Sequence, residues 1–163
     1  MIFIGIGSNL SSGSGTPAQT CRQALDRLQE QGVRILALSR FYESAPVPVS
    51  DQPWFVNAVA ALGTDLGAAE LLALMHQVEA AFGRQRRVVN EARTLDMDLI
   101  DYNGMCKVGA LALPHPRAAE RAFVLLPLRE LAPDWLHPVS GRSIGDLIAH
   151  LPPGQLIRPL ASE

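Results

Sequence analysis

The sequence has few cysteines, no long apolar run and no basic segment at its start, and each of these absences argues against a class of protein. Cysteine occurs only at Cys21 and Cys106, which favours a reducing compartment over a disulfide scaffold. No apolar run approaches the roughly 18 residues of a membrane span, and the start at 1–7 lacks the basic segment typical of a secretion signal. We therefore expect a cytoplasmic protein that does not bind membranes.

An excess of positive charge is also missing. The formal net charge is −2 at pH 7, which argues against a nucleic-acid-binding protein because such proteins usually carry a basic surface. Lys107 is the only lysine beside 13 arginines. A GC-rich genome explains that ratio, but it does not explain why six of the arginines lie between Arg84 and Arg121. Because a guanidinium group binds phosphate in a planar fork, this stretch is a candidate phosphate-binding segment.

A single domain is expected for the whole chain. It has 163 residues without a repeat or a low-complexity run, and domains usually hold roughly 100–200 residues. Its apolar content of 48% is ordinary for a globular protein and too high for a disordered one. We therefore treat residues 1–163 as one folded unit.

Hydrophobic periodicity and capping residues predict the secondary structure. Thr16, Pro17 and Gln19 form the signature of a capping box at a helix start, and Gly32 is a typical helix stop. Asn103-Gly104 is a turn signal after the last long strand. The predicted strands are 2–6, 33–43, 54–62 and 95–102, and the predicted helices are 17–31 and 68–82. A mobile loop is expected at 84–92, a helical pattern from 116 that Pro127 interrupts and Pro133 ends, and a short helix from about 143.

The element order β-α-β-β-α-β indicates a fold class. It is the order of a ferredoxin-like α+β sandwich, in which two helices pack on an antiparallel sheet. We expect that arrangement here, with extra helical elements at the C-terminal end. The other face or an edge of the sheet is then left for a site, although the fold alone specifies no function.

Asp96 and Asp98 are the strongest chemical signal. They alternate with Leu95, Met97 and Leu99, and alternate residues of a strand share a face, roughly 6.6–6.8 Å apart. The apolar residues are expected to face the core and the two carboxylates to project together. Two close carboxylates repel each other, and Mg²⁺ relieves the repulsion while also binding phosphate oxygens. The alternative is an ordinary strand whose polar face meets solvent.

The neighbouring residues favour the metal interpretation. Arg93 stands just before the pair, and Arg86 lies in a basic stretch upstream. Phosphoryl transfer needs this combination, because metal ions and cationic side chains neutralise the transferring group. Glu79 falls near the apolar side of the predicted helix 68–82, where a carboxylate needs a cation or a hydrogen-bond donor.

Further candidates lie on both sides of that strand. His115 stands between two prolines, and Arg121 and Phe123 follow it. Phe55 and Asn57 share one side of a predicted strand, where an aromatic ring can stack on a heterocycle and an amide can bind its edge. The alternative for each is structural: a plain turn, a core aromatic or a hydrogen-bonded asparagine.

These motifs occur in one order along nearly the whole chain. They are Gly7–Leu10, Phe41–Pro46, Asp51–Ala58, Glu79 with Gly83-Arg84, Arg93–Leu99, Leu113–Arg117 and Arg121–Leu128. Together they resemble the 6-hydroxymethyl-7,8-dihydropterin pyrophosphokinase family of folate biosynthesis. The resemblance implies that ATP gives its β,γ-pyrophosphoryl group to the hydroxymethyl oxygen of the pterin and leaves AMP.

The resemblance also implies a role for each candidate. Asp96 and Asp98 are expected to bind two Mg²⁺ ions, with Arg86 and Arg93 as catalytic residues beside them, in a monomer whose loop 84–92 closes over ATP and the pterin. The implied ATP-binding residues are Glu79, Arg86, Arg93, Leu99, His115 and Arg121. The implied pterin-binding residues are Ser44, Val47, Phe55, Asn57, Asp96 and Phe123, with the two phenylalanines on either side of the ring.

The chain departs from the family pattern in places. Asn90-Glu91-Ala92 stands where Trp-Gly-Pro often precedes the arginine, and Phe55 replaces a common tyrosine. Two alternatives therefore stay open. One is a non-catalytic ferredoxin-like module for nucleotide or RNA, against which the missing aromatic RNA-binding pattern argues. The other is an inactive paralogue.

Overall fold

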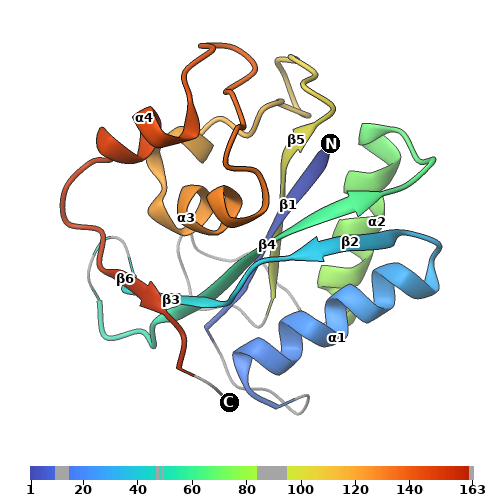
Figure 1. The fold of residues 1–163 in the computed structure, drawn as a ribbon. Coiled ribbons are helices and arrows are strands. Elements are labelled where there is room, and N and C mark those ends of the chain that lie inside the picture. Colours follow the sequence, from blue (N-terminus) through green and yellow to red (C-terminus); the bar gives the residue numbers. More distant parts are fainter. Residues whose placement is uncertain (10–14, 47, 49, 84–94, 162–163) are drawn as a thin grey trace.

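A computed structural model describes residues 1–9, 15–46, 48, 50–83 and 95–161 (Figure 1). They form one six-stranded sheet in the order β5-β1-β4-β3-β6, with β2 also paired to β4. All these pairings are antiparallel, so the predicted α+β class is confirmed. The strands are β1 Ile2–Ser8, β2 Arg34–Leu38, β3 Tyr42–Ser44, β4 Phe55–Gly63, β5 Asp96–Tyr102 and β6 Ile157–Pro159.

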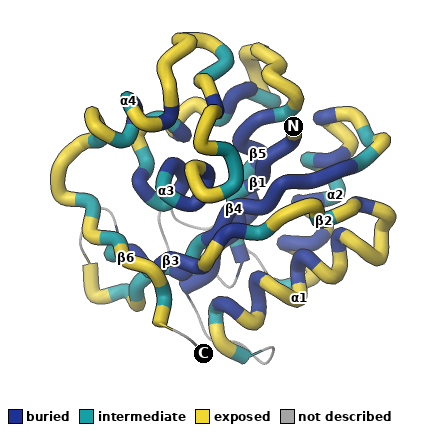
Figure 2. The backbone as a smooth tube through the Cα atoms, in the orientation of Figure 1, coloured by how far each residue is buried: buried dark blue, intermediate teal, exposed yellow. Residues whose placement is uncertain are grey.

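Helices lie on both faces of the sheet. α1 Pro17–Glu30 and α2 Ala68–Ala81 pack on one face, and the 3₁₀ helix η1 Ala118–Glu120 with α3 Ala122–Leu131 and α4 Ile144–Ala149 covers part of the other. The first core is the apolar layer between the sheet and the helices α1 and α2, and it includes Ile4 and Leu71. The second core is the apolar layer between the sheet and the helices α3 and α4, and it includes Phe3 and Val59. Figure 2 shows the buried strands running between these helices. The face that the sequence left for a site is thus partly covered by the expected C-terminal helices, and a site there lies beside α3.

The start of α1 follows from its sequence. The Thr16 hydroxyl accepts a hydrogen bond from the Gln19 amide N–H at 3.2 Å, and the Gln19 side chain accepts one from the Thr16 N–H at 2.9 Å. After the helix, Gly32 adopts a φ of 90°, which side chains disfavour. The predicted helix boundaries are therefore confirmed. Ser143 likewise caps α4 through the Asp146 N–H, as the prediction of a last helix requires.

The predicted strand 33–43 is wrong in one respect, because it is two strands. Leu38 pairs with Ala60 and Tyr42 pairs with Asn57, so residues 39–41 lie opposite only 58–59 of β4. Ser39 fills the break: its Oγ accepts the Val59 N–H at 3.0 Å and donates to the Arg40 carbonyl at 2.8 Å. The two strands are thus separated at a side-chain contact, and neither a glycine nor a proline lies at residues 39–41.

The predicted interruption at Pro127 is also wrong, because α3 continues from Ala122 to Leu131. A proline inside a helix removes one backbone hydrogen bond and costs about 3 kcal/mol. Val124, Leu125 and Leu128 are buried in the second core, and each buried side chain contributes about 1.5–3 kcal/mol. Tertiary packing therefore outweighs the local preference.

The predicted order of elements agrees with the structure over the central part of the chain. When β2 and β3 are counted as one interrupted strand, the elements from β1 to β5 follow the predicted order. The second helical layer is the expected C-terminal addition, whereas β6 was not predicted. β6 pairs with β3 and so places residues 157–159 beside Tyr42 and Ser44.

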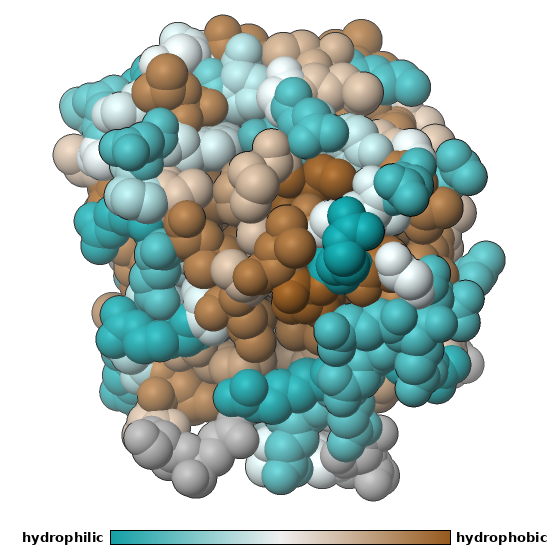
Figure 3. All heavy atoms as spheres, turned by 45° about the vertical axis from the view of Figure 1, so that its right-hand side comes forward, coloured by the Kyte–Doolittle hydropathy of each residue, from teal (hydrophilic) through white to brown (hydrophobic). Residues whose placement is uncertain are grey.

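β2 lies at a border of the sheet, and its residues are mostly exposed. Leu36 is 54% exposed, and Figure 3 shows apolar side chains gathered near the middle of the face that includes the right-hand side of Figure 1.

In the described ranges, no helix is both long enough and apolar enough to span a bilayer.

Candidate functional site

The register of the sheet brings several predicted site residues onto the face beside α3. Gly7 of β1 lies between Asp96 of β5 and Asn57 of β4. Asn57 in turn lies opposite Tyr42 of β3. Because opposite residues in antiparallel strands share a face, these four residues form one row. Asp96 and Asn57 therefore project from the same side of the sheet, with a glycine between them.

The neighbouring rows extend this surface in both directions. Asp98 lies opposite Gly5, and Phe55 lies opposite Ser44. The face thus carries two carboxylates at one end and an aromatic ring with an amide toward the other. The alternate side chains belong to the first core, as the alternation predicted: Leu95 just before β5, and Met97 and Leu99 within it.

Gly7 matters because Asn57 uses the space above it. A Cβ at Gly7 would overlap the Oδ1 of Asn57 and lie 3.1 Å from its Cγ. The other end of the amide donates from Nδ2 to the Ser44 hydroxyl at 3.4 Å. A Cβ at Gly5 would meet only Ile100 Cδ1, at an ordinary 3.5 Å. Gly7 and Ser44 therefore fix the orientation in which Asn57 presents its amide.

Asp98 faces two basic side chains from the segment after β5. His115 Nε2 lies 3.7 Å from its Oδ1, and Arg121 Nη1 lies 4.0 Å from its Oδ2. Each of the three side chains is between 23% and 29% exposed, so the group is accessible from one side. A carboxylate, an imidazole and a guanidinium thus converge where a ligand can still reach them.

His115 is held as a neutral donor. Its Nδ1 accepts the Arg117 N–H at 3.2 Å, which leaves the proton on Nε2, and its own N–H donates to the Ile100 carbonyl at 2.9 Å. Burial lowers the pKa of His115 below its usual value, Asp98 opposes that shift, and Arg121 adds to it. The imidazole is therefore uncharged at pH 7, with an N–H directed toward Asp98.

Arg121 and Phe123 form a second pair at the start of α3. The guanidinium carbon of Arg121 lies 5.3 Å from the centroid of the Phe123 ring, within the range of a cation–π contact. Phe123 packs against the second core, and Phe55 is half-buried on the sheet. The two aromatic rings that the resemblance assigns to the pterin thus come from a helix and from the sheet that it covers.

Glu79 approaches β5 from the opposite side. Only 3% of Glu79 is exposed, and its Oε2 accepts the Met97 N–H at 2.9 Å. Met97 lies between Asp96 and Asp98, so this buried carboxylate holds the backbone that carries the acidic pair. The sequence indicated that Glu79 needs a donor, and the structure supplies a peptide N–H as one such donor.

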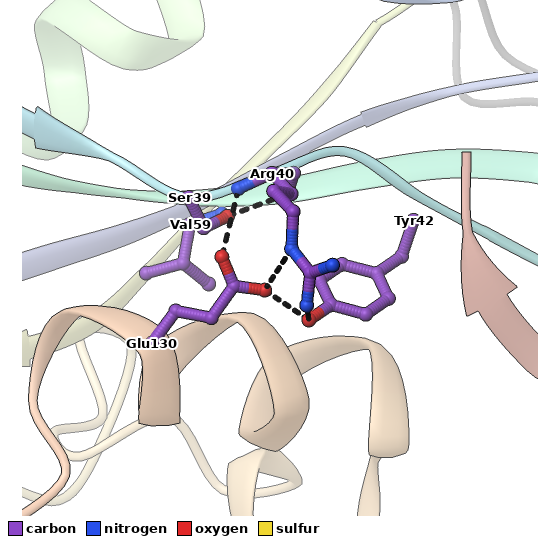
Figure 4. A network of polar contacts seen from close by, with 5 residues as sticks. All are labelled: Ser39, Arg40, Tyr42, Val59 and Glu130. Carbon is purple, nitrogen blue, oxygen red and sulfur yellow. Dashed lines mark hydrogen bonds and ion pairs between the residues drawn. The ribbon is translucent and has the colours of Figure 1, made fainter. Parts of the chain in front are cut away.

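A polar network that the sequence did not reveal joins α3 to the break between β2 and β3 (Figure 4). Glu130 of α3 accepts the Arg40 N–H at 3.1 Å, the Arg40 Nε–H at 3.3 Å and the Tyr42 hydroxyl. Burial and then the bond to Glu130 raise the pKa of Tyr42. Burial alone would raise the pKa of Glu130, but its bonds to Tyr42 and Arg40 outweigh it and lower that pKa.

Some predicted site residues lie outside the described residues: Val47, Arg86, Arg93 and the loop 84–92. Leu99 is described, and only 4% of it is exposed because its side chain lies in the first core. Its side chain and the carboxylate of Asp98 are therefore on opposite faces. A contact between Leu99 and a ligand beside Asp98 would have to come from its backbone.

The site suits a ligand that is anionic at one end and planar at the other. Carboxylates, an uncharged imidazole and a guanidinium lie at the β5 end, and an oriented amide with an aromatic ring lies on β4. Charged and polar groups that converge beside apolar surface are typical of an enzyme's ligand site, and these groups suit a phosphate compound together with a heterocycle.

Comparison with known proteins identifies the family. Residues 3–133 match the family model of 7,8-dihydro-6-hydroxymethylpterin-pyrophosphokinase (HPPK). The chain belongs to this family. It is also 36% identical over 158 residues to the 2-amino-4-hydroxy-6-hydroxymethyldihydropteridine pyrophosphokinase of Methylorubrum extorquens, and the match covers 96% of each chain.

Two further relatives differ in length. The pyrophosphokinase of the same name from Pseudomonas aeruginosa is 39% identical over 155 residues, which cover 93% of this chain and 91% of that protein. The Folic acid synthesis protein fol1 of Pneumocystis carinii is 35% identical over 144 residues. That match covers 88% of this chain but only 19% of the fungal protein, so the chain corresponds to about a fifth of it.

Proposed function

We propose that this chain, as a pyrophosphokinase of folate biosynthesis, transfers the β,γ-pyrophosphoryl group of ATP to the hydroxymethyl oxygen of 6-hydroxymethyl-7,8-dihydropterin. The products are AMP and the pterin diphosphate. One observation supports the assignment of the site: Asp96 and Asp98 share a face with Asn57, and Asp98 lies beside His115 and Arg121. Membership of the HPPK family supplies the reaction.

The family uses ATP with a metal ion, and the acidic pair fits a hard cation. Asp96 and Asp98 are half-buried on one face, and the glycines opposite them carry no side chain. Within the described part of the chain, no set of three or more acidic, histidine or cysteine side chains could hold a metal. Mg²⁺ typically binds one or two carboxylates and takes phosphate oxygens and water in its other positions. Asp96 and Asp98 would hold two Mg²⁺ ions, which would supply positive charge to neutralise the phosphates.

The chain's own residues bind and orient the phosphates. Arg121 supplies a permanent positive charge, and His115 supplies an uncharged N–H donor, which can bind a phosphate oxygen without changing its protonation state. We assign the same work to Arg86 and Arg93, which follow from the family motif. Glu79 acts from behind the strand, because it holds the Met97 peptide between the two aspartates.

The pterin is assigned to the other end of the site. Asn57 donates and accepts hydrogen bonds at the edge of the heterocycle, and the Ser44 hydroxyl and Gly7 keep its amide in place. Phe55 and Phe123 stack on the two faces of the ring. The segment at Ser44 and Val47 also contacts the edge of the pterin, and Asp96 lies next to its hydroxymethyl group.

We further propose a single catalytic domain over 1–163 that acts as a monomer in the cytoplasm. Cys21 is buried and Cys106 is exposed, and both are free thiols. Free thiols are usual in a reducing compartment, which supports that location.

A product assay tests the reaction. The purified protein is incubated with ATP, Mg²⁺ and the reduced pterin, and the nucleotides are separated by chromatography. AMP should form in proportion to pterin diphosphate, and omission of the pterin should abolish it. Formation of ADP would mean a monophosphoryl transfer. No turnover together with tight binding of single-stranded RNA would mean a binding module.

A further inference from the structure

Arg121 occupies a junction between two helical segments. Its backbone is extended, with φ −115° and ψ 117°, between the end of η1 and the start of α3. Its N–H donates to the Ala118 carbonyl at a long 3.4 Å, and its side chain makes no capping bond to α3. The first N–H group of a helix and the last carbonyl of a 3₁₀ turn have no partner within their own segment. The peptides on both sides of Arg121 therefore need partners from elsewhere.

Gln155 supplies both partners. Its Oε1 accepts the Ala122 N–H at 2.8 Å, and its Nε2 donates to the Glu120 carbonyl at 2.9 Å. The same Nε2 also donates to the Pro152 carbonyl at 3.2 Å. One side-chain amide thus binds the peptide group before Arg121 and the peptide group after it. Glutamine can do this because its amide has an acceptor and two donors.

Gln155 is itself fixed to the sheet. The next residue, Leu156, accepts the Ala45 N–H at 3.0 Å through its carbonyl, and β6 follows in register with β3. This segment lies beyond residues 3–133, which the family model matches. The C-terminal segment therefore connects β3 of the sheet to the first turn of α3.

We infer that Gln155 is a positioning residue that sets the Arg121 guanidinium, and with it the Phe123 ring, for the substrates. This inference rests on the proposed function, in which Arg121 binds the phosphates of ATP. Without the amide of Gln155, the Ala122 N–H and the Glu120 carbonyl each lose a partner, and the turn that orients Arg121 toward Asp98 loosens. At metal sites, loss of the groups that orient the ligands typically costs about 10–100-fold in affinity or activity, and we expect an effect of that order for Arg121.

The test compares Gln155→Met with wild type, because methionine keeps the side-chain length and removes all three hydrogen bonds. The KM for ATP should rise about tenfold, with a smaller change in kcat and a similar weakening of the Kd for a non-hydrolysable ATP analogue with Mg²⁺. Arg142→Gln is the control: it removes the Arg142–Asp146 ion pair of 2.6 Å in the same C-terminal part and should leave both constants unchanged. A purely structural role would lower the thermal midpoint and the active fraction at unchanged KM and Kd, which would overturn the inference.

A double-mutant cycle separates action through Arg121 from any other route. On an Arg121→Ala background, Gln155→Met should change the Kd of the analogue by less than about twofold, because coupled residues do not add. Additive losses would overturn the inference. If the wild-type chain binds the analogue but makes no AMP, the proposed reaction is contradicted. The inference about Gln155 is then still tested by the Kd of the analogue. A wild-type chain that binds no analogue contradicts both.

Discussion

Replacing Gly7 with alanine would place a methyl group where the Asn57 amide now lies. The added Cβ would overlap Asn57 Oδ1 and would stand 3.1 Å from its Cγ and 3.3 Å from the Val56 carbonyl oxygen. The carbonyl belongs to β4 and has little room to move, so the Asn57 side chain has to rotate. Its hydrogen bond to the Ser44 hydroxyl at 3.4 Å is then lost. Gly7→Ala thus perturbs the proposed pterin edge through Asn57, whose side chain holds the atoms nearest to the added Cβ.

The size of the effect follows from these contacts. Overpacking in a close-packed region costs about 1–3 kcal/mol of stability. Each hydrogen bond that Asn57 no longer makes to the pterin is worth about 0.5–1.5 kcal/mol. Two such bonds amount to about 1–3 kcal/mol, which corresponds to a rise of roughly 5- to 150-fold in the KM for the pterin, since about 1.4 kcal/mol is a factor of ten. The KM for ATP should change much less.

Steady-state kinetics with each substrate varied in turn, together with urea denaturation, measures both effects. Gly5→Ala is the matched variant on the same strand and face: its Cβ would meet Ile100 Cδ1 at 3.5 Å, an ordinary contact, so its losses should be clearly smaller. If the overlap with Asn57 is the cause, Gly7→Ala should cost little stability on an Asn57→Ser background. Equal effects of Gly5→Ala and Gly7→Ala, or a Gly7→Ala enzyme with an unchanged pterin KM, would refute the reasoning.

Three further predictions concern the acidic end of the site. Asp98→Ala should lower kcat by roughly two to three orders of magnitude, as removal of a charge-stabilising group does, with an unchanged circular dichroism spectrum; near-normal turnover would contradict the metal assignment. Glu79→Ala leaves the buried Met97 N–H without this acceptor, so the free energy of unfolding in urea should fall by about 1–3 kcal/mol, and a smaller loss would mean that water replaces the carboxylate. Burial lowers the pKa of His115 in the folded state, so the unfolded chain binds the proton first as the pH falls below about 6.5. Folding stability therefore decreases on acidification through this group, and His115→Gln should flatten the decline in urea midpoint between pH 8 and 5.5.

The elements that the sequence predicted well are those whose cause is local. The Thr16–Gln19 capping box sets the start of α1, and Asn103 with φ 53° and Gly104 with φ 73° form the expected turn after β5. The alternation of charged and apolar residues in β5 fixed the faces of Asp96 and Asp98 correctly. In each case the residues that decide the conformation lie within a few positions of one another, so a single stretch of sequence holds the information.

The features that were missed depend on contacts between distant segments. The break between β2 and β3 arises where Ser39 replaces a ladder bond of Val59, 20 positions away. Glu130 binds Arg40 across 90 positions, and Gln155 binds Ala122 across 33. None of these polar residues belongs to a motif, and each would pass for a solvated surface residue. Only the fold brings their partners within hydrogen-bond distance.

Two of these distant contacts act on the same helix. Gln155 holds the first turn of α3, where Arg121 and Phe123 lie, and Glu130 holds its last turn to the strand break next to Tyr42. Pro127 lies between these two anchors, the Gln155 contacts and the Glu130 contacts, and it removes a backbone hydrogen bond from the helix. Local helix propensity therefore contributes little to the stability of α3. Both anchors lead to the edge of the sheet near β3, the strand that also carries Ser44. These contacts hold α3 against the sheet at both of its ends. They therefore help to set the distance between the helical residues and the sheet residues that the proposed reaction uses.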